Sequence, residues 1–264
     1  MPLSSREQAR RFAKTSREGF EAVAGTFESL REDEWSGPTG CAKWDMRVLA
    51  GHIVGEAVWF ANVVRGVTRG DKPHSSGLYE ELNRLPPMEM AARTTSAARE
   101  IEDSIGEATG EQLEEPADMG WTKMPLWRAA RVSTMEAVLH EWDTRARREK
   151  DPTIPASWAN IIAESLVESG PFLAHQNALC GNEGTYALEV DEPIGPVTIQ
   201  VLTNRVQMTE GPAHSPDLVL RVTADQYVRL ITGRLDGKKE NVAAEGDRDR
   251  VEALTHVFAG IANG

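Results

Sequence analysis

Two residue types suited to metal binding lie one helical turn apart in the segment MEAVLHEWD, which contains Glu136 and His140. Side chains four residues apart on an α-helix project from the same face. A carboxylate and an imidazole in that arrangement can bind the same cation. His52, in the segment RVLAGHIVGE, offers a third ligand from the apolar stripe of another predicted helix. Two histidines and one glutamate suit zinc and leave a fourth position for water or substrate.

Two structural interpretations compete with metal binding. A histidine on an apolar face is often a hydrogen-bonded core residue, and a Glu-x-x-x-His pair is often a contact that faces solvent. Glu136 and His140, however, border an apolar stripe made of Val132, Met135, Leu139 and Trp142. A carboxylate so close to a core is unfavourable unless it is paired or bound to a metal. The pattern therefore favours a metal site while leaving a structural role open.

Two further carboxylates flank these residues. Glu56 lies four residues after His52 and is a candidate ligand, a partner of a ligand, or one half of an ion pair within the bundle. Asp143 lies three residues after His140, where it can accept a hydrogen bond from the imidazole or fix the end of the helix. The spacing does not distinguish these roles.

The first 150 residues are predicted to be helical. Apolar residues recur at steps of three and four, and Asp45 is a candidate N-cap of the second helix. The predicted helices cover residues 6–30, 46–67, 87–110 and 125–149. Four long helices joined by loops favour a bundle, in which metal ligands point inward from facing helices.

The second half has a different pattern. After the proline-containing break KDPTIPAS, a helix is predicted over 158–174, followed by the strand-like segments TYALEV, VTIQVLT, RVQMTE and DLVLRVT. We therefore expect an α+β chain of two domains. The predicted divisions are a metal-binding helix bundle over 1–150, a connecting helix and linker over 151–180, and a small α+β domain over 181–264.

The composition restricts the function classes. The 264 residues are 40% hydrophobic and 27% charged, and no run of apolar residues is long enough to span a membrane. The N-terminus lacks an apolar signal core, and Cys41 and Cys180 have neither metal-binding nor redox spacing. A net charge of −12 opposes nucleic-acid binding. We expect a cytoplasmic monomer or homodimer that binds neither membranes nor nucleic acid.

Several of these segments resemble one known family. CAKWDMRVLAGHIVGE and MEAVLHEWDTRARRE are similar to the second- and fourth-helix signatures of the mycothiol-dependent maleylpyruvate isomerase family, within the DinB-like superfamily. PDLVLRVTADQYVRLITGRLDG and VAAEGDRDRVEALTHVF are similar to the C-terminal domain of that family, which is related to sterol-carrier proteins. The resemblance covers nearly the whole chain and implies a four-helix DinB-like bundle followed by a sterol-carrier-like α+β domain.

The resemblance also implies a site and a reaction. The zinc ligands of the family fall on His52, Glu136 and His140, the trio that spacing indicates, and Arg234 in ITGRLD matches an arginine that acts near the substrate. The implied enzyme uses zinc, or another divalent metal, to activate mycothiol, its co-substrate, for attack on an electrophilic small molecule. The product would result from S-transfer or from cis–trans isomerisation of a maleylpyruvate-like acid.

The chain departs from the family pattern at Val48, where an acidic residue is common, and at Glu141, where glycine is common. Because both residues could change the shape of the pocket, the resemblance does not identify the substrate. Two other functions remain compatible with the sequence: a hydrolase that uses zinc-bound water, and a non-enzymatic protein that binds a hydrophobic ligand. Assays with and without added mycothiol would distinguish the hydrolase from the mycothiol-dependent enzyme. The absence of bound metal would indicate the non-enzymatic binding protein.

Overall fold

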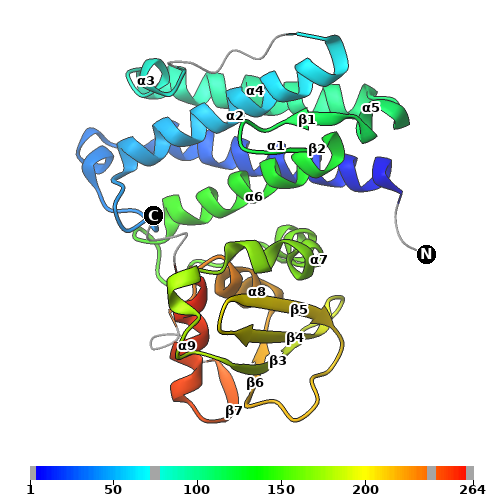
Figure 1. Ribbon diagram of the computed structural model, residues 1–264. Coiled ribbons are helices and arrows are strands. Elements are labelled where there is room, and N and C mark those ends of the chain that lie inside the picture. The colour runs from blue at the N-terminus through cyan, green and yellow to red at the C-terminus, as the bar shows by residue number, and fades with distance from the viewer. Residues whose placement is uncertain (1–3, 72–77, 237–241, 260–264) are drawn as a thin grey trace. The chain divides into compact units, whose positions relative to one another are not determined.

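The computed structural model describes residues 4–71, 78–236 and 242–259 (Figure 1). The chain divides into two compact units, Met1–Pro152 and Thr153–Gly264. The first unit is predominantly helical and the second combines helices with a five-stranded sheet.

The first unit is a bundle of four long helices. These are α1 (Ser5–Ser29), α2 (Met46–Arg69), α4 (Pro87–Glu107) and α6 (Leu126–Arg145). Helices α1 and α2 each pack against both α4 and α6, as Figure 1 shows in blue, cyan and green. Their inward faces form a core that includes Phe12, Phe20, Ile53, Phe60 and Ile101, all buried. The predicted bundle is therefore confirmed.

The ends of these helices follow local sequence signals. Ser4 and Glu7 form a capping box at the start of α1. The side chain of Asp45 accepts a hydrogen bond from the backbone N–H of Val48, 2.9 Å away, and so caps α2 as predicted. Helix α6 ends at Arg145 instead of Glu149, and the chain turns so that Trp142 Nε1 donates to the carbonyl of Pro152.

Shorter elements of the first unit were not predicted. They are the 3₁₀ helix η1 (Glu32–Ser36), the helices α3 (Leu78–Leu82) and α5 (Gly110–Glu114), and a hairpin of β1 (Pro116–Asp118) and β2 (Lys123–Pro125). The hairpin packs on α2 and α6. Trp121, between its two strands, stacks on Trp59 of α2 with ring centroids 5.4 Å apart.

The second unit is an α+β domain. Its helices are α7 (Ala156–Leu173), α8 (Ala224–Ile231) and α9 (Asp249–Phe258), and η2 (Gln176–Ala178) is a 3₁₀ helix. Its strands are β3 (Gly184–Val190), β4 (Gly195–Leu202), β5 (Arg205–Glu210), β6 (Leu218–Val222) and β7 (Ala243–Gly246). They form one sheet in the order β5-β4-β3-β6-β7, in which only β3 and β6 pair in parallel.

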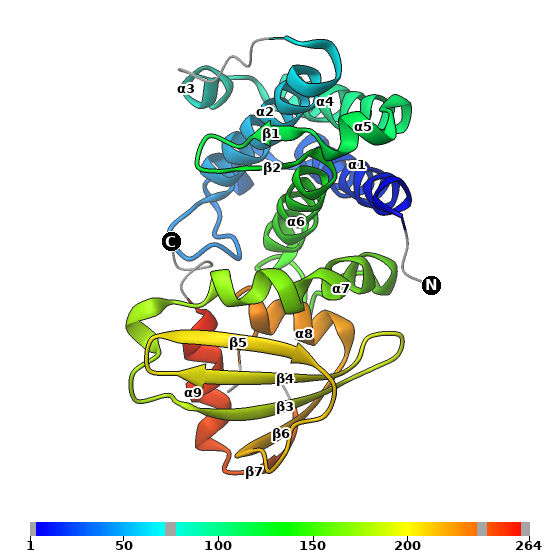
Figure 2. The same ribbon diagram turned by 45° about the vertical axis from the view of Figure 1, so that its right-hand side comes forward.

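The helices of this unit cover its sheet. Figure 2 shows α8 and α9 behind one face. Helix α7 packs against α8 and β5, and so contributes to the core of the second unit. The segment 151–180, predicted as a connection between domains, thus contains a helix of the second unit itself. Alternate residues of β3, Tyr186, Leu188 and Val190, are buried. Within the described ranges, no helix combines the length and apolarity needed to cross a membrane.

Candidate metal centre

Helices α2 and α6 bring the three predicted ligands together. Oε2 of Glu136 lies 3.1 Å from Nε2 of His140 and 3.6 Å from Nε2 of His52. One ligand atom from each of the three side chains lies within 4.8 Å of the other two. The side chain of His140 is buried, whereas about a quarter of the surface of His52 and a third of that of Glu136 is exposed (25% and 33%). The group is therefore fixed on one side and accessible on the other.

These distances fit a small divalent cation. In a regular tetrahedron the edge is about 1.6 times the distance from centre to corner, so metal–ligand bonds of about 2.0–2.1 Å separate the ligand atoms by about 3.3–3.4 Å. The two distances of 3.1 and 3.6 Å bracket that value. Two imidazoles and one carboxylate form a donor set typical of catalytic zinc sites, which keep one position open. That these residues hold a metal remains a prediction.

Asp143 holds the other edge of the His140 ring. Its Oδ2 lies 2.8 Å from Nδ1 of His140, and its side chain is fully buried. An ionised carboxylate only accepts hydrogen bonds, so Nδ1 carries the proton and the lone pair of the neutral ring resides on Nε2, the atom that faces Glu136. Of the two roles left open by the sequence, the structure shows the hydrogen bond to the imidazole. Such a partner fixes both the tautomer and the orientation of a metal-binding histidine.

The electrostatics of the group favour a cation among its side chains. Burial lowers the pKa of His140, but its hydrogen bonds with Asp143, Cys41 and Glu136 outweigh that effect and hold the pKa well above its ordinary value. Burial raises the pKa of Glu136, and the hydrogen bonds and positive charge of His140 and His52 outweigh it, so that this pKa lies far below its ordinary value. The carboxylate is thus ionised, and the His140 ring readily takes up a proton, which a metal ion at Nε2 would have to displace.

Glu56 and Tyr79 form a hydrogen-bonded pair beside His52. Tyr79 Oη donates to Oε1 of Glu56 at 2.6 Å, and the Tyr79 ring stacks on that of His52 with centroids 6.3 Å apart. Burial, followed by the negative charge of Glu136, raises the pKa of Glu56. Burial and the bond to Glu56 raise the pKa of Tyr79, so the phenol keeps its proton. Glu56 does not belong to either group of candidate ligands found among the described residues.

Two glycines of α2 allow Tyr79 of α3, and Asn83 just after α3, to lie against the backbone of α2. A Cβ atom at Gly51 would lie 1.4 Å from Oδ1 of Asn83, and one at Gly55 would lie 2.3 Å from the ring of Tyr79. Because residues 51 and 55 are one turn apart, they form a bare strip on one face of the helix. The strip lets Tyr79 pack directly on the backbone of the helix that carries His52 and Glu56.

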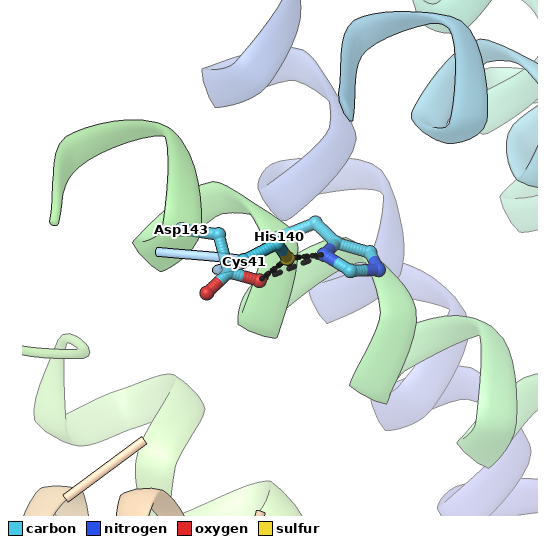
Figure 3. A group of neighbouring side chains, drawn as sticks. All are labelled: Cys41, His140 and Asp143. Carbon is cyan, nitrogen blue, oxygen red and sulfur yellow. Dashed lines mark hydrogen bonds and ion pairs between the residues drawn. The ribbon is translucent and has the colours of Figure 1, made fainter. Parts of the chain in front are cut away.

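Cys41 is a member of this region that sequence patterns did not indicate. Its Sγ lies 3.3 Å from Oδ2 of Asp143 and 4.0 Å from Nδ1 of His140, and the three residues form a second group whose potential ligand atoms lie close together. Figure 3 shows Cys41 and Asp143 on the Nδ1 side of the ring, with Nε2 directed away from both. Cys41 and His140 are 99 positions apart, so no local spacing could reveal the contact. Tyr79 was missed for the same reason.

The structure also describes the surroundings of the other predicted residues. Arg234, in the second unit, is buried and its Nη1 donates to the carbonyl of Thr232 at 3.0 Å; its role near a substrate remains a prediction. The carboxylate of Glu141 accepts two hydrogen bonds from Arg145, at 2.7 and 2.8 Å. Val48 is exposed. These contacts give Glu141 a structural role at the end of α6.

The helix bundle is similar to a known protein family. The profile of the mycothiol maleylpyruvate isomerase N-terminal domain matches residues 16–145, which include all members of both ligand groups. No curated protein matches the sequence significantly.

Solved structures share the fold of the whole chain. Crystal structures of the mycothiol-dependent maleylpyruvate isomerase and of its H52A mutant each match 92% of this chain and 96% of theirs, with a TM-score of 0.63 and 13% identity. The predicted α+β, two-domain architecture is thereby confirmed. The sterol carrier protein domain 2 of Helicoverpa armigera matches 39% of this chain and 86% of its own, with 19% identity and a TM-score of 0.27.

Proposed function

We propose that the chain is a metal-dependent enzyme that uses mycothiol as co-substrate, because its residues 16–145 match the profile of the mycothiol maleylpyruvate isomerase N-terminal domain. The activated thiol attacks an electrophilic small molecule. The observation that carries this proposal is the convergence of His52, Glu136 and His140 at distances suited to one divalent ion with a vacant coordination position. We propose zinc as that ion and the cytoplasm as the location of the enzyme.

Zinc held by these residues would supply a positive charge that stabilises the thiolate form of mycothiol at neutral pH. The chain prepares the site for that charge. Asp143 keeps the proton on Nδ1 of His140, so that the lone pair on Nε2 is available to bind the metal. Glu136 contributes one negative charge, which favours binding of the cation, and the exposed sides of His52 and Glu136 leave room for the thiol.

The reaction on the substrate is addition of sulfur to an electrophilic carbon. With a cis enedione acid, the thiolate adds to the carbon–carbon double bond, the resulting single bond rotates, and elimination restores both the thiolate and a trans double bond. With an acceptor whose addition product takes up a proton at the neighbouring carbon and does not undergo elimination, the sulfur stays attached and the result is S-transfer. Glu56, whose raised pKa follows from burial, can hold a proton at Oε2, since its Oε1 accepts the hydrogen bond from Tyr79. Arg234 is proposed to bind an anionic group of the substrate, on the basis of family resemblance.

Substitution of His52 tests the proposal. The purified protein should contain about one equivalent of zinc by elemental analysis, and His52→Ala should lose both the metal and the mycothiol-dependent conversion of a maleylpyruvate-like acid. His214→Ala is the matched control, because His214 is exposed in a loop of the second unit. Full activity of the His52→Ala variant would exclude the proposed metal centre. Equal activity with and without mycothiol would instead indicate a hydrolase that uses metal-bound water.

A further inference from the structure

Cys41 belongs to a loop that is attached directly to the last turns of α6. The backbone N–H of Gly40 donates to the carbonyl of Asp143 at 2.9 Å. A Cβ atom at Gly40 would lie 2.4 Å from Oδ1 and 2.9 Å from Cα of Asp143. The absence of a side chain at this position therefore allows the loop to contact the helix backbone and brings the next residue, Cys41, to the Asp143 carboxylate.

A buried threonine fixes the conformation of the loop. Oγ1 of Thr39 accepts a hydrogen bond from the backbone N–H of Cys41 at 3.1 Å and lies 2.8 Å from the carbonyl of Trp44, to which it donates. Thr39 and Cys41 are both buried. The thiol is therefore held in one place by hydrogen bonds of its own loop, and its position does not depend on packing alone.

One carboxylate oxygen receives two donors. Oδ2 of Asp143 lies 3.3 Å from Sγ of Cys41 and 2.8 Å from Nδ1 of His140 (Figure 3). Because the ionised carboxylate can only accept, the thiol donates its S–H to Oδ2. We propose that Cys41 is a positioning residue of the metal centre: its S–H fixes the Asp143 carboxylate, which in turn fixes the His140 ring with Nε2 toward Glu136. This inference rests on the proposed metal centre.

The same geometry argues against Cys41 as a ligand of the metal. The thiol and Asp143 act on the Nδ1 edge of the ring, whereas Glu136 and His52 face its Nε2 edge. A neutral imidazole has one lone pair, so it cannot bind cations at both nitrogens. With the proton on Nδ1, the metal lies on the opposite edge from the sulfur.

Two substitutions of opposite character test the role of the thiol. Cys41→Ser retains a hydrogen-bond donor but loses apolar volume, whereas Cys41→Val retains the volume but loses the donor. Removal of an outer partner of a metal ligand typically weakens metal binding by about 10–100-fold. We therefore expect about a tenfold increase in the zinc dissociation constant of Cys41→Val and less than about a threefold change for Cys41→Ser. Cys180→Ser, at an exposed cysteine, is the control and should bind zinc as the unsubstituted chain does.

The reverse order, with Cys41→Val equal to the control and Cys41→Ser weakened, would show that the thiol acts through packing and would overturn the proposal. A double-mutant cycle provides the second measurement. In an Asp143→Ala background, Cys41→Val should change zinc affinity by less than about twofold, since Cys41 acts through that carboxylate. An undiminished tenfold effect in that background would also overturn it.

A third measurement separates this inference from the proposed function. Nitrogen chemical shifts of the His140 ring report which nitrogen carries the proton, and they can be recorded in protein stripped of metal. At a pH where the ring is neutral, the proton should reside on Nδ1 in the unsubstituted protein and in Cys41→Ser. In Cys41→Val the ring should be a mixture of the two tautomers. Absence of zinc from the unsubstituted protein would refute the proposed function alone, whereas identical ring shifts in all variants would refute the role of Cys41.

Discussion

Nε2 of His140 and Oε2 of Glu136 lie 3.1 Å apart on consecutive turns of α6. Without a metal, this contact is an ion pair between an imidazolium and a carboxylate. In the proposed metal centre both atoms would be ligands, and the ring would give up a proton. The pair therefore links three measurable quantities: metal affinity, protonation and folding stability.

Replacing Glu136 by glutamine should weaken zinc binding by at least about 100-fold, because a direct ligand contributes more than the outer partners whose loss costs about 10–100-fold. Competition with a chelator of known affinity measures the effect. Glu141→Gln is a matched control on the same helix, since the Glu141 carboxylate bonds to Arg145 and not to the ligand group. Similar affinities of the two variants would argue against the assigned ligand set.

The stability of the metal-free protein should depend on pH in both directions. The pKa of His140 is raised, so its stabilising contribution is complete below the ordinary value of 6.5 and is lost as the pH rises through the raised pKa. The pKa of Glu136 is lowered, so its contribution is complete above 4.5 and is lost only at much lower pH. Together the two shifts predict that the pair stabilises the folded protein most between pH 4.5 and pH 6.5.

Urea unfolding of chelator-treated protein across pH 5 to 10 measures this dependence. The unfolding free energy contributed by the pair should decline on the alkaline side, and His140→Gln should remove that decline. A variant whose pH profile keeps the same shape would show that His140 is not the titrating group.

Tyr79→Phe should lower stability by about 1–3 kcal/mol, because it leaves the partly buried carboxyl group of Glu56 without its donor. Zinc content should not change, since neither residue belongs to a ligand group. The double variant with Glu56→Leu should lose less stability than the sum of the two single variants. Additive losses measured by thermal unfolding would mean that the two side chains do not interact.

Gly55→Ala should destabilise the protein by about 1–3 kcal/mol, because the new methyl group would lie 2.3 Å from the ring of Tyr79 and overlap it. Gly25→Ala in α1 is the control, since no atom lies within 4 Å of a Cβ there. That substitution should stabilise the helix by up to about 1 kcal/mol. Opposite signs in a denaturant titration support the close approach of α3, and two stabilising substitutions would contradict it.

The long elements of the fold were predictable because each has a periodic apolar pattern. Phe12, Phe20, Val23 and Phe27 are buried as their spacing indicates, and the four bundle helices lie within a few residues of their predicted positions. The hairpin β1–β2 and helix α3 were missed. Such short elements have little periodicity of their own, and their positions depend on contacts such as the stacking of Trp121 on Trp59.

The part of the candidate site formed by neighbouring residues of one helix was also predictable from the sequence. Glu136, His140 and Asp143 are local neighbours on one helix, so helical geometry alone brings them together. Glu56 was identified by its distance from His52, but its partner Tyr79 lies 23 positions further along the chain. Cys41 reaches Asp143 only through the fold of its loop, 102 positions away. Contacts of this kind follow from tertiary structure and leave no spacing in the sequence.

The two edges of the His140 ring face different groups: Nδ1 lies beside Asp143, and Nε2 lies beside Glu136. Cys41 and Asp143 contact one edge of the ring inside the protein, and the other edge faces the partly exposed side chains of Glu136 and His52. Substitutions on the accessible side can therefore alter which acceptor molecules fit without loosening the anchored ring. A bundle built in this way would be able to diversify its chemistry over evolution while the proposed metal ligands stay the same.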